Sequence, residues 1–187
     1  MLEEFRSRHP DAEQPAVRWL PFQLNPHIPA EGMPRGDYLE RKFGNRKGAY
    51  ERVAAVGAKV GIPFAFDRIT VQPNTVDAHR LLAYADRAGH QNEMAEALFH
   101  GYFIEGANIT DAATLAAIAA KAGFDAGRVA SYLAGDEDRA TVLEADRTAR
   151  DSGMVDGVPF FIFNRKVGVP GAQDATVLLD ALEQSLA

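Results

Sequence analysis

The residues that could carry chemistry are few in this 187-residue sequence. There is no cysteine, which excludes disulfides, zinc–thiolate sites and a thiol nucleophile among its own side chains. Five histidines are present: His9, His27, His79, His90 and His100. No two of them have the i, i+4 spacing of a helical metal site, so we predict no metal. No serine lies in a Gly-x-Ser-x-Gly elbow and there is no glycine-rich phosphate loop, which leaves a hydrolase without support.

One candidate binding element is the step Gly157-Val158-Pro159, which opens the apolar run Phe160 to Phe163. A bond before proline adopts the cis form at modest cost, and we predict a cis bond here. Such a bend would leave the N–H and C=O of Val158 outside the strand ladder, where an extended partner could pair with them. An ordinary proline at the start of a strand is the alternative.

A second candidate is Gly171-Ala172-Gln173, which precedes a helix predicted for residues 174–186. Free N–H groups and the helix dipole favour an anion at such a position. A plain helix cap with no ligand is an equal alternative.

Several predicted elements must position these residues. A helix opens the chain at residues 1–8, a strand follows at 17–24, and a proline-rich loop spans 25–36. Apolar spacing and glycine stops then predict helices at 37–43, 47–60, 75–88, 91–104, 111–122, 125–133 and 136–151. A β-hairpin covers 157–169. Helix, strand, helical block, hairpin and helix in this order predict an α/β protein with a helical insertion.

Composition and charge narrow the partners. The net charge is −6 and the pI is about 5.4, and the basic residues Arg41, Lys42, Arg46 and Lys47 are flanked by acidic ones. We therefore expect no nucleic acid. No apolar run approaches the roughly 20 residues that span a bilayer, so we expect no membrane. The charged N-terminus does not resemble a secretory signal, which predicts a cytoplasmic protein.

Longer stretches resemble the FrnE-type group of DsbA-like thioredoxin-fold proteins. These are residues 17–26, 74–81, 97–109, 157–163 and 171–173, in order along the chain. The resemblance implies one DsbA-like thioredoxin domain over residues 1–187, with a helical insertion at 75–153. It implies a dithiol–disulfide oxidoreductase or isomerase that holds a thiol- or disulfide-containing peptide, or glutathione as substrate or co-substrate, and uses no other cofactor. Val158, Pro159, Gly171, Ala172 and Gln173 would be the substrate-binding residues. The resemblance is compatible with a homodimer.

The same family begins with a strand that ends in Cys-Pro-Trp-Cys. That first strand and both cysteines are missing from this chain, and Met1 falls where the family's first helix is already under way. We therefore expect no catalytic residue and no redox activity in the chain as written, and a truncated or misassigned start.

Two alternatives stay open. One is a glutathione-dependent enzyme of the 2-hydroxychromene-2-carboxylate isomerase type, which has a serine in place of the first cysteine. The other is a non-catalytic thioredoxin-like binding module, which the lack of cysteine favours.

Overall fold

The computed structural model describes residues 1–44, 48 and 50–186. Its helices and strands follow the chain in this order: α1 (Leu2–Arg8), β1 (Met33–Pro34), α2 (Arg35–Phe43), α3 (Glu51–Lys59), the 3₁₀ turn η1 (Phe66–Arg68), β2 (Val71–Gln72), α4 (Val76–Arg87), α5 (Gln91–Phe103), α6 (Ala112–Lys121), α7 (Ala126–Ala134), α8 (Arg139–Asp151), β3 (Phe160–Phe163), β4 (Val167–Pro170) and α9 (Ala175–Leu186).

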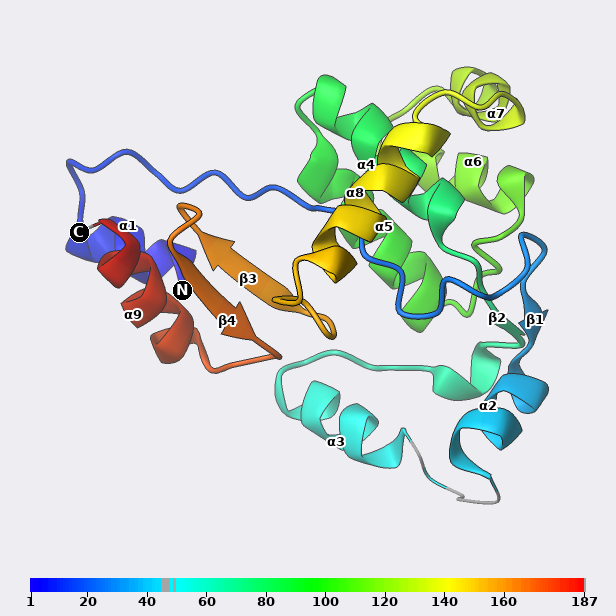
Figure 1. Cartoon of the computed structure of the whole chain (residues 1–187), viewed down its shortest axis with the longest axis horizontal. Helices are drawn as coiled ribbons and strands as arrows, with labels where there is room; N and C mark the ends of the chain where they lie inside the picture. The colour runs from blue at the N-terminus through cyan, green and yellow to red at the C-terminus, as the bar shows by residue number, and fades with distance from the viewer. Residues whose placement is uncertain (45–47, 49, 187) are drawn as a thin grey trace.

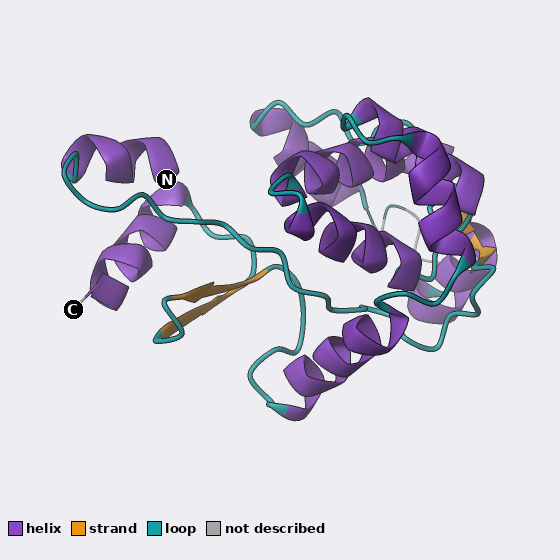
Figure 2. Cartoon of the chain, turned by 90° about the horizontal axis from the view of Figure 1, so that it is seen from above, coloured by secondary structure: helices purple, strands orange, loops and turns teal. Residues whose placement is uncertain are grey.

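The elements form two lobes (Figures 1 and 2). The hairpin lobe consists of α1, β3, β4 and α9, and both ends of the chain lie in it. The helical lobe consists of α2 to α8 with the short antiparallel pair β1–β2. A strap, residues 9–24, runs from the end of α1 to the helical lobe, and residues 152–159 return from α8 to β3.

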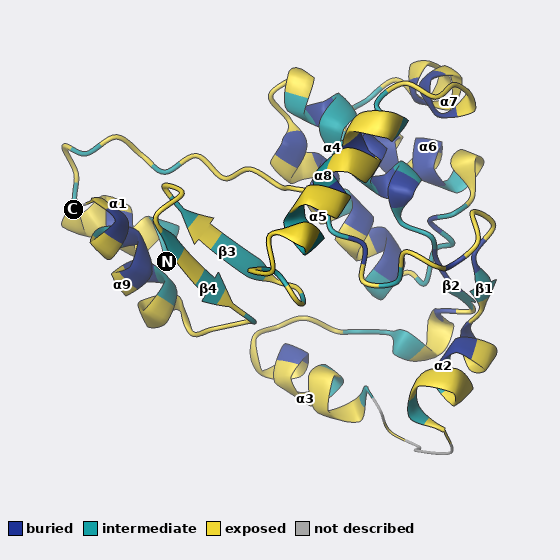
Figure 3. Cartoon of the chain, in the orientation of Figure 1, coloured by how far each residue is buried: buried dark blue, intermediate teal, exposed yellow. Residues whose placement is uncertain are grey.

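Each lobe has its own hydrophobic core, and the two differ in size (Figure 3). In the helical lobe a large set of buried side chains from α4 to α7 packs together, with Leu81 and Leu115 fully enclosed. In the hairpin lobe the buried set is Phe5, Leu179 and Leu182, with Phe163 half-buried against it. Because apolar burial is the main source of stability, the helical lobe carries most of it.

Capping side chains set where several helices begin. Asp111 Oδ2 accepts from the Thr114 amide at 2.8 Å, and Asp125 Oδ1 accepts from the Arg128 amide at 2.7 Å. Each bond satisfies an amide that has no partner within its helix. At α4 the cap is supplied by Asn74, whose Oδ1 accepts from the Val76 amide at 3.0 Å.

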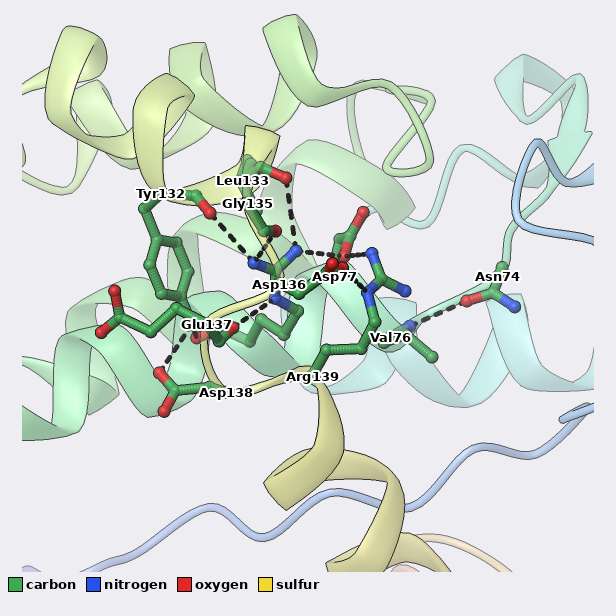
Figure 4. A network of polar contacts seen from close by, with 11 residues as sticks. Asn74, Val76, Asp77, Tyr132, Leu133, Gly135, Asp136, Glu137, Asp138 and Arg139 are labelled. Carbon is green, nitrogen blue, oxygen red and sulfur yellow. Dashed lines mark hydrogen bonds and ion pairs between the residues drawn. The ribbon is translucent and has the colours of Figure 1, made fainter.

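Arg80 is fully buried and ties α4 to the turn between α7 and α8. Figure 4 shows this polar network, with the partners Asp77, Tyr132, Gly135 and Glu137 labelled. The Arg80 guanidinium donates to the carbonyl oxygens of Tyr132, Gly135 and Glu137, at 2.9, 2.6 and 2.8 Å. It also pairs with the Asp77 carboxylate at 2.9 Å. The last carbonyl groups of a helix have no hydrogen-bond partner within it. Arg80, which belongs to the neighbouring helix α4, therefore caps the C-terminal end of α7.

Residues 17–24 do not form the predicted strand. No strand within the described part of the chain pairs with them, and side chains of the helical lobe bind their backbone instead. Gln91 accepts from the Trp19 amide at 2.8 Å and donates to the Trp19 carbonyl at 3.1 Å. Asp146 accepts from the Gln23 amide at 2.6 Å. A composition that favours extended backbone becomes a strand only when a partner edge is present.

The remaining elements lie close to their predicted places. Five helices, α4 to α8, occupy the range 75–153 in which a helical insertion is predicted. The predicted start of α3 at Lys47, and the neighbouring Arg46, lie outside the described residues. None of the helices described is long and apolar enough to cross a membrane.

Candidate substrate-binding site

The candidate site is built on the β3–β4 hairpin. Its turn places Asn164 and Arg165 at positive φ, 49° and 59°, and the Lys166 amide closes the turn on the Phe163 carbonyl at 2.9 Å. Asparagine tolerates this left-handed conformation better than most residues. The turn sets the antiparallel register, in which Phe161 lies opposite Val169 and Phe163 opposite Val167.

This register decides which backbone groups of β3 are used. In an antiparallel pair, alternate residues bond the partner strand and the residues between them point to the other edge. Pro159 accepts from the Gly171 amide at 2.8 Å, so residues 159, 161 and 163 face β4. Pro170 lies opposite Phe160 and has no N–H to offer, which fits the same alternation. The backbone groups of Val158, Phe160 and Ile162 therefore point away from β4.

We call this the free edge of β3. No strand of the described chain pairs with it, and the Val158 N–H and C=O make no hydrogen bond to a described residue. Val158 and Ile162 are both 47% exposed. The peptide bond between Val158 and Pro159 is cis. The free edge can accept an extended main chain, because its donors and acceptors have the spacing of a strand.

The structure brings the two predicted parts of the site together. The Gly171–Pro159 hydrogen bond joins them directly, so the segment between β4 and α9 lies beside the start of β3. The same bond occupies the Gly171 amide. The amides of Ala172 and Gln173 make no backbone hydrogen bond to a described residue, while the Gln173 side chain folds back onto the Pro170 carbonyl at 2.9 Å. An anion could therefore meet two of the three predicted amides.

The site contains no group that could exchange disulfides, because the sequence has no cysteine. In the described part of the chain no three histidine, aspartate or glutamate side chains gather closely enough to hold a metal ion. The arrangement can recognise a main chain, because it offers a strand edge and two backbone amides in the segment just before α9.

Residues 1–183 match the DsbA-like thioredoxin domain family. The chain belongs to this family. A crystal structure of a probable DsbA oxidoreductase from Streptomyces coelicolor superposes with a TM-score of 0.78 and is 31% identical, over 88% of this chain and 73% of that one. The uncharacterised protein YwbO of Bacillus subtilis is 24% identical over 166 residues, which cover 89% of this chain and 80% of that protein. The thioredoxin-like, α/β fold expected from the sequence is thereby confirmed.

Two features of this DsbA-like chain are not foreseen from its sequence. Gln91 and Asp146 hold the strap. From sequence alone, a glutamine at a helix start and an aspartate in the middle of a helix are both expected to face solvent. The one sequence feature that could point to Asp146 is Arg150, one helical turn later, whose guanidinium pairs with the Asp146 carboxylate at 3.3 Å. Such i, i+4 pairs are common on exposed helices, so this signal does not distinguish a buried anchor from a surface pair.

Proposed function

We propose that this chain is the substrate-binding part of a thiol–disulfide oxidoreductase or isomerase. The free edge of β3 pairs with the backbone of a thiol- or disulfide-containing peptide, or of glutathione, and the amides of Ala172 and Gln173 receive a carboxylate of that ligand. Membership of the DsbA-like family supports the general chemistry. The unpaired N–H and C=O of Val158 are the observation that carries the binding role.

Disulfide exchange needs a thiolate as the attacking group, and the 187 residues supply none. We infer that this chain binds its substrate without reducing or isomerising it. The absence of cysteine also favours the second candidate function, a thioredoxin-like binding module with no redox step. The two candidates share the binding site and differ in whether a thiol is brought to it.

A backbone titration tests the binding role. Oxidised glutathione and a short disulfide-bridged peptide are added separately to ¹⁵N-labelled protein. We expect saturable changes in the amide resonances of Val158, Phe160 and Ile162. Gly168 is the internal control, because its amide lies on the outer edge of β4. Changes confined to Gly168, or spread evenly over both lobes, would contradict a site on the free edge.

A second assay separates binding from chemistry. The same protein is mixed with insulin and dithiothreitol, and precipitation of the reduced insulin chains is followed. We expect the rate with protein to equal the rate without it. A clear acceleration would show that some other group in the chain activates the added thiol, and would overturn the inference that the chain only binds.

A further inference from the structure

Arg35, the first residue of α2, is a buried cation whose hydrogen bonds are incomplete. The residue is 8% exposed. Its Nη1 donates to Gln72 Oε1, but Nε is buried without a partner, and Nη2 makes no hydrogen bond to a described residue. No described carboxylate pairs with the guanidinium, and the undescribed positions 45–47, 49 and 187 have no acidic side chain.

Two other arginines of this chain have guanidinium groups whose hydrogen bonds and ion pairs are satisfied. Arg80 is buried and uses Nε, Nη1 and Nη2 in hydrogen bonds. Arg87 lies over the rings of Tyr84 and Tyr132 and pairs with Asp138 and Glu137. A buried charge is costly unless it is paired and hydrogen-bonded. Arg35 therefore stands out as the buried guanidinium that lacks a partner on one edge.

Aromatic rings lie over the Arg35 guanidinium, and further hydrogen-bond donors belong to the same group of side chains. The guanidinium carbon lies 4.7 Å from the centre of the Tyr50 ring and 5.6 Å from that of Tyr38. The Tyr102 hydroxyl is buried and has no hydrogen-bond partner. Burial raises the pKa of Tyr102 to about 12, against the opposing effect of the Arg35 charge, so this hydroxyl keeps its proton and can donate it in a hydrogen bond. Lys42 adds a second cation nearby, with Nζ 2.7 Å from the Tyr38 hydroxyl.

We propose that the Nε–Nη2 edge of Arg35, together with the Tyr102 hydroxyl, binds a small oxyanion, the carboxylate of an organic acid or inorganic phosphate. The planar guanidinium presents two parallel N–H groups on this edge, which match two oxygens of one anion. Aromatic walls keep competing water away, and a charge-assisted hydrogen bond is strongest where water is excluded. Gln72 accepts a hydrogen bond from Nη1 on the opposite side of the guanidinium and so fixes the direction in which the Nε–H and Nη2–H groups point.

The test follows the Arg35 Nε–Hε resonance in the full chain. Sodium acetate and sodium phosphate are titrated separately, with ionic strength held constant by sodium chloride. We expect a saturable downfield shift of Hε with one or both probes. Arg35→Lys keeps the positive charge but removes the two parallel N–H donors. It should weaken binding at least tenfold, measured by calorimetry. Tyr102→Phe should weaken it several-fold. Arg87→Lys is the matched control and should leave the affinity unchanged.

Two results would overturn the proposal: the same shift with sodium chloride alone, or no shift with either probe. In both cases the aromatic rings and a buried water would be enough to stabilise the Arg35 charge without a bound oxyanion. A response to acetate alone identifies an organic carboxylate, and a response to phosphate alone identifies phosphate. If Arg35→Lys fails to fold, the titration of the unaltered protein and the Tyr102→Phe variant still decide the matter.

Discussion

Replacing Arg80 by methionine should destabilise the helical lobe by several kilocalories per mole. Methionine keeps much of the apolar stem and removes only the guanidinium. The change leaves the carbonyls of Tyr132, Gly135 and Glu137 without the donors that now lie 2.6 to 2.9 Å away. It also leaves Asp77 with Arg139 as its remaining cation, at 3.0 Å.

The magnitude follows from two opposing terms. Hydrogen bonds to a charged group contribute roughly 1.5–3 kcal/mol each to the free energy of unfolding. Adding three of them would overstate the loss of stability in the variant. The guanidinium, however, loses its own hydration when it is buried, and that cost disappears in the variant. Removing one partner of a buried charged network typically costs about 3–5 kcal/mol, and we expect a value in this range.

The assay is urea unfolding followed by far-UV circular dichroism, which reports mainly on the helices. Arg87→Met is the matched control, because Arg87 also pairs with acidic side chains but is about half exposed, at 48% for its side chain. Exposed pairs contribute only about 0–1 kcal/mol. An Arg80→Met protein as stable as the unaltered chain, or more stable, would refute the reasoning and show that dehydration cancels the hydrogen bonds.

Three further perturbations test other parts of the structure. Asp111→Ala removes the cap of α6 and should cost about 1 kcal/mol in urea unfolding; an unchanged midpoint would mean that water replaces the cap. Gln91→Ala releases both backbone groups of Trp19 and should shift the fluorescence of this single tryptophan to longer wavelength; an unshifted spectrum would show that other contacts hold the strap. Burial lowers the pKa of His79, so its contribution to stability is complete above the unfolded pKa of about 6.5 and declines as pH falls below it. His79→Gln should therefore reduce the difference in urea midpoint between pH 7.5 and pH 5, and an equal difference in the variant would contradict this.

The sequence predicts the helices well because their signals are local. Asp111 and Asp125 start α6 and α7 through bonds to amides three residues along the chain, and glycines at positive φ follow several helix ends. The hairpin is predictable for the same reason, since Asn164 lies within the turn that closes it. Local preference decides these elements before any tertiary contact is considered.

The parts that depend on distant contacts are harder to predict. Residues 17–24 have the composition of a strand, but pairing needs two segments, and no strand of the described chain pairs with them. Arg80 occurs on an amphipathic helix, where an arginine normally faces water, and only the position of α7 makes it a buried cap. Pro159 and Gly171 are joined by a hydrogen bond between residues on opposite sides of the hairpin. This contact becomes predictable only once the register of the two strands is known.

The unequal size of the two cores has a consequence for how ligands would be detected. The buried hydrophobic cluster of the hairpin lobe consists of Phe5, Leu179 and Leu182. This lobe should therefore open at a lower free energy than the helical lobe, and without it. A molecule bound at the free edge of β3 would suppress that partial opening while leaving the main melting transition almost unchanged. A screen based on the melting temperature of the whole chain would overlook such a molecule. Slower hydrogen exchange at the hairpin amides would reveal it.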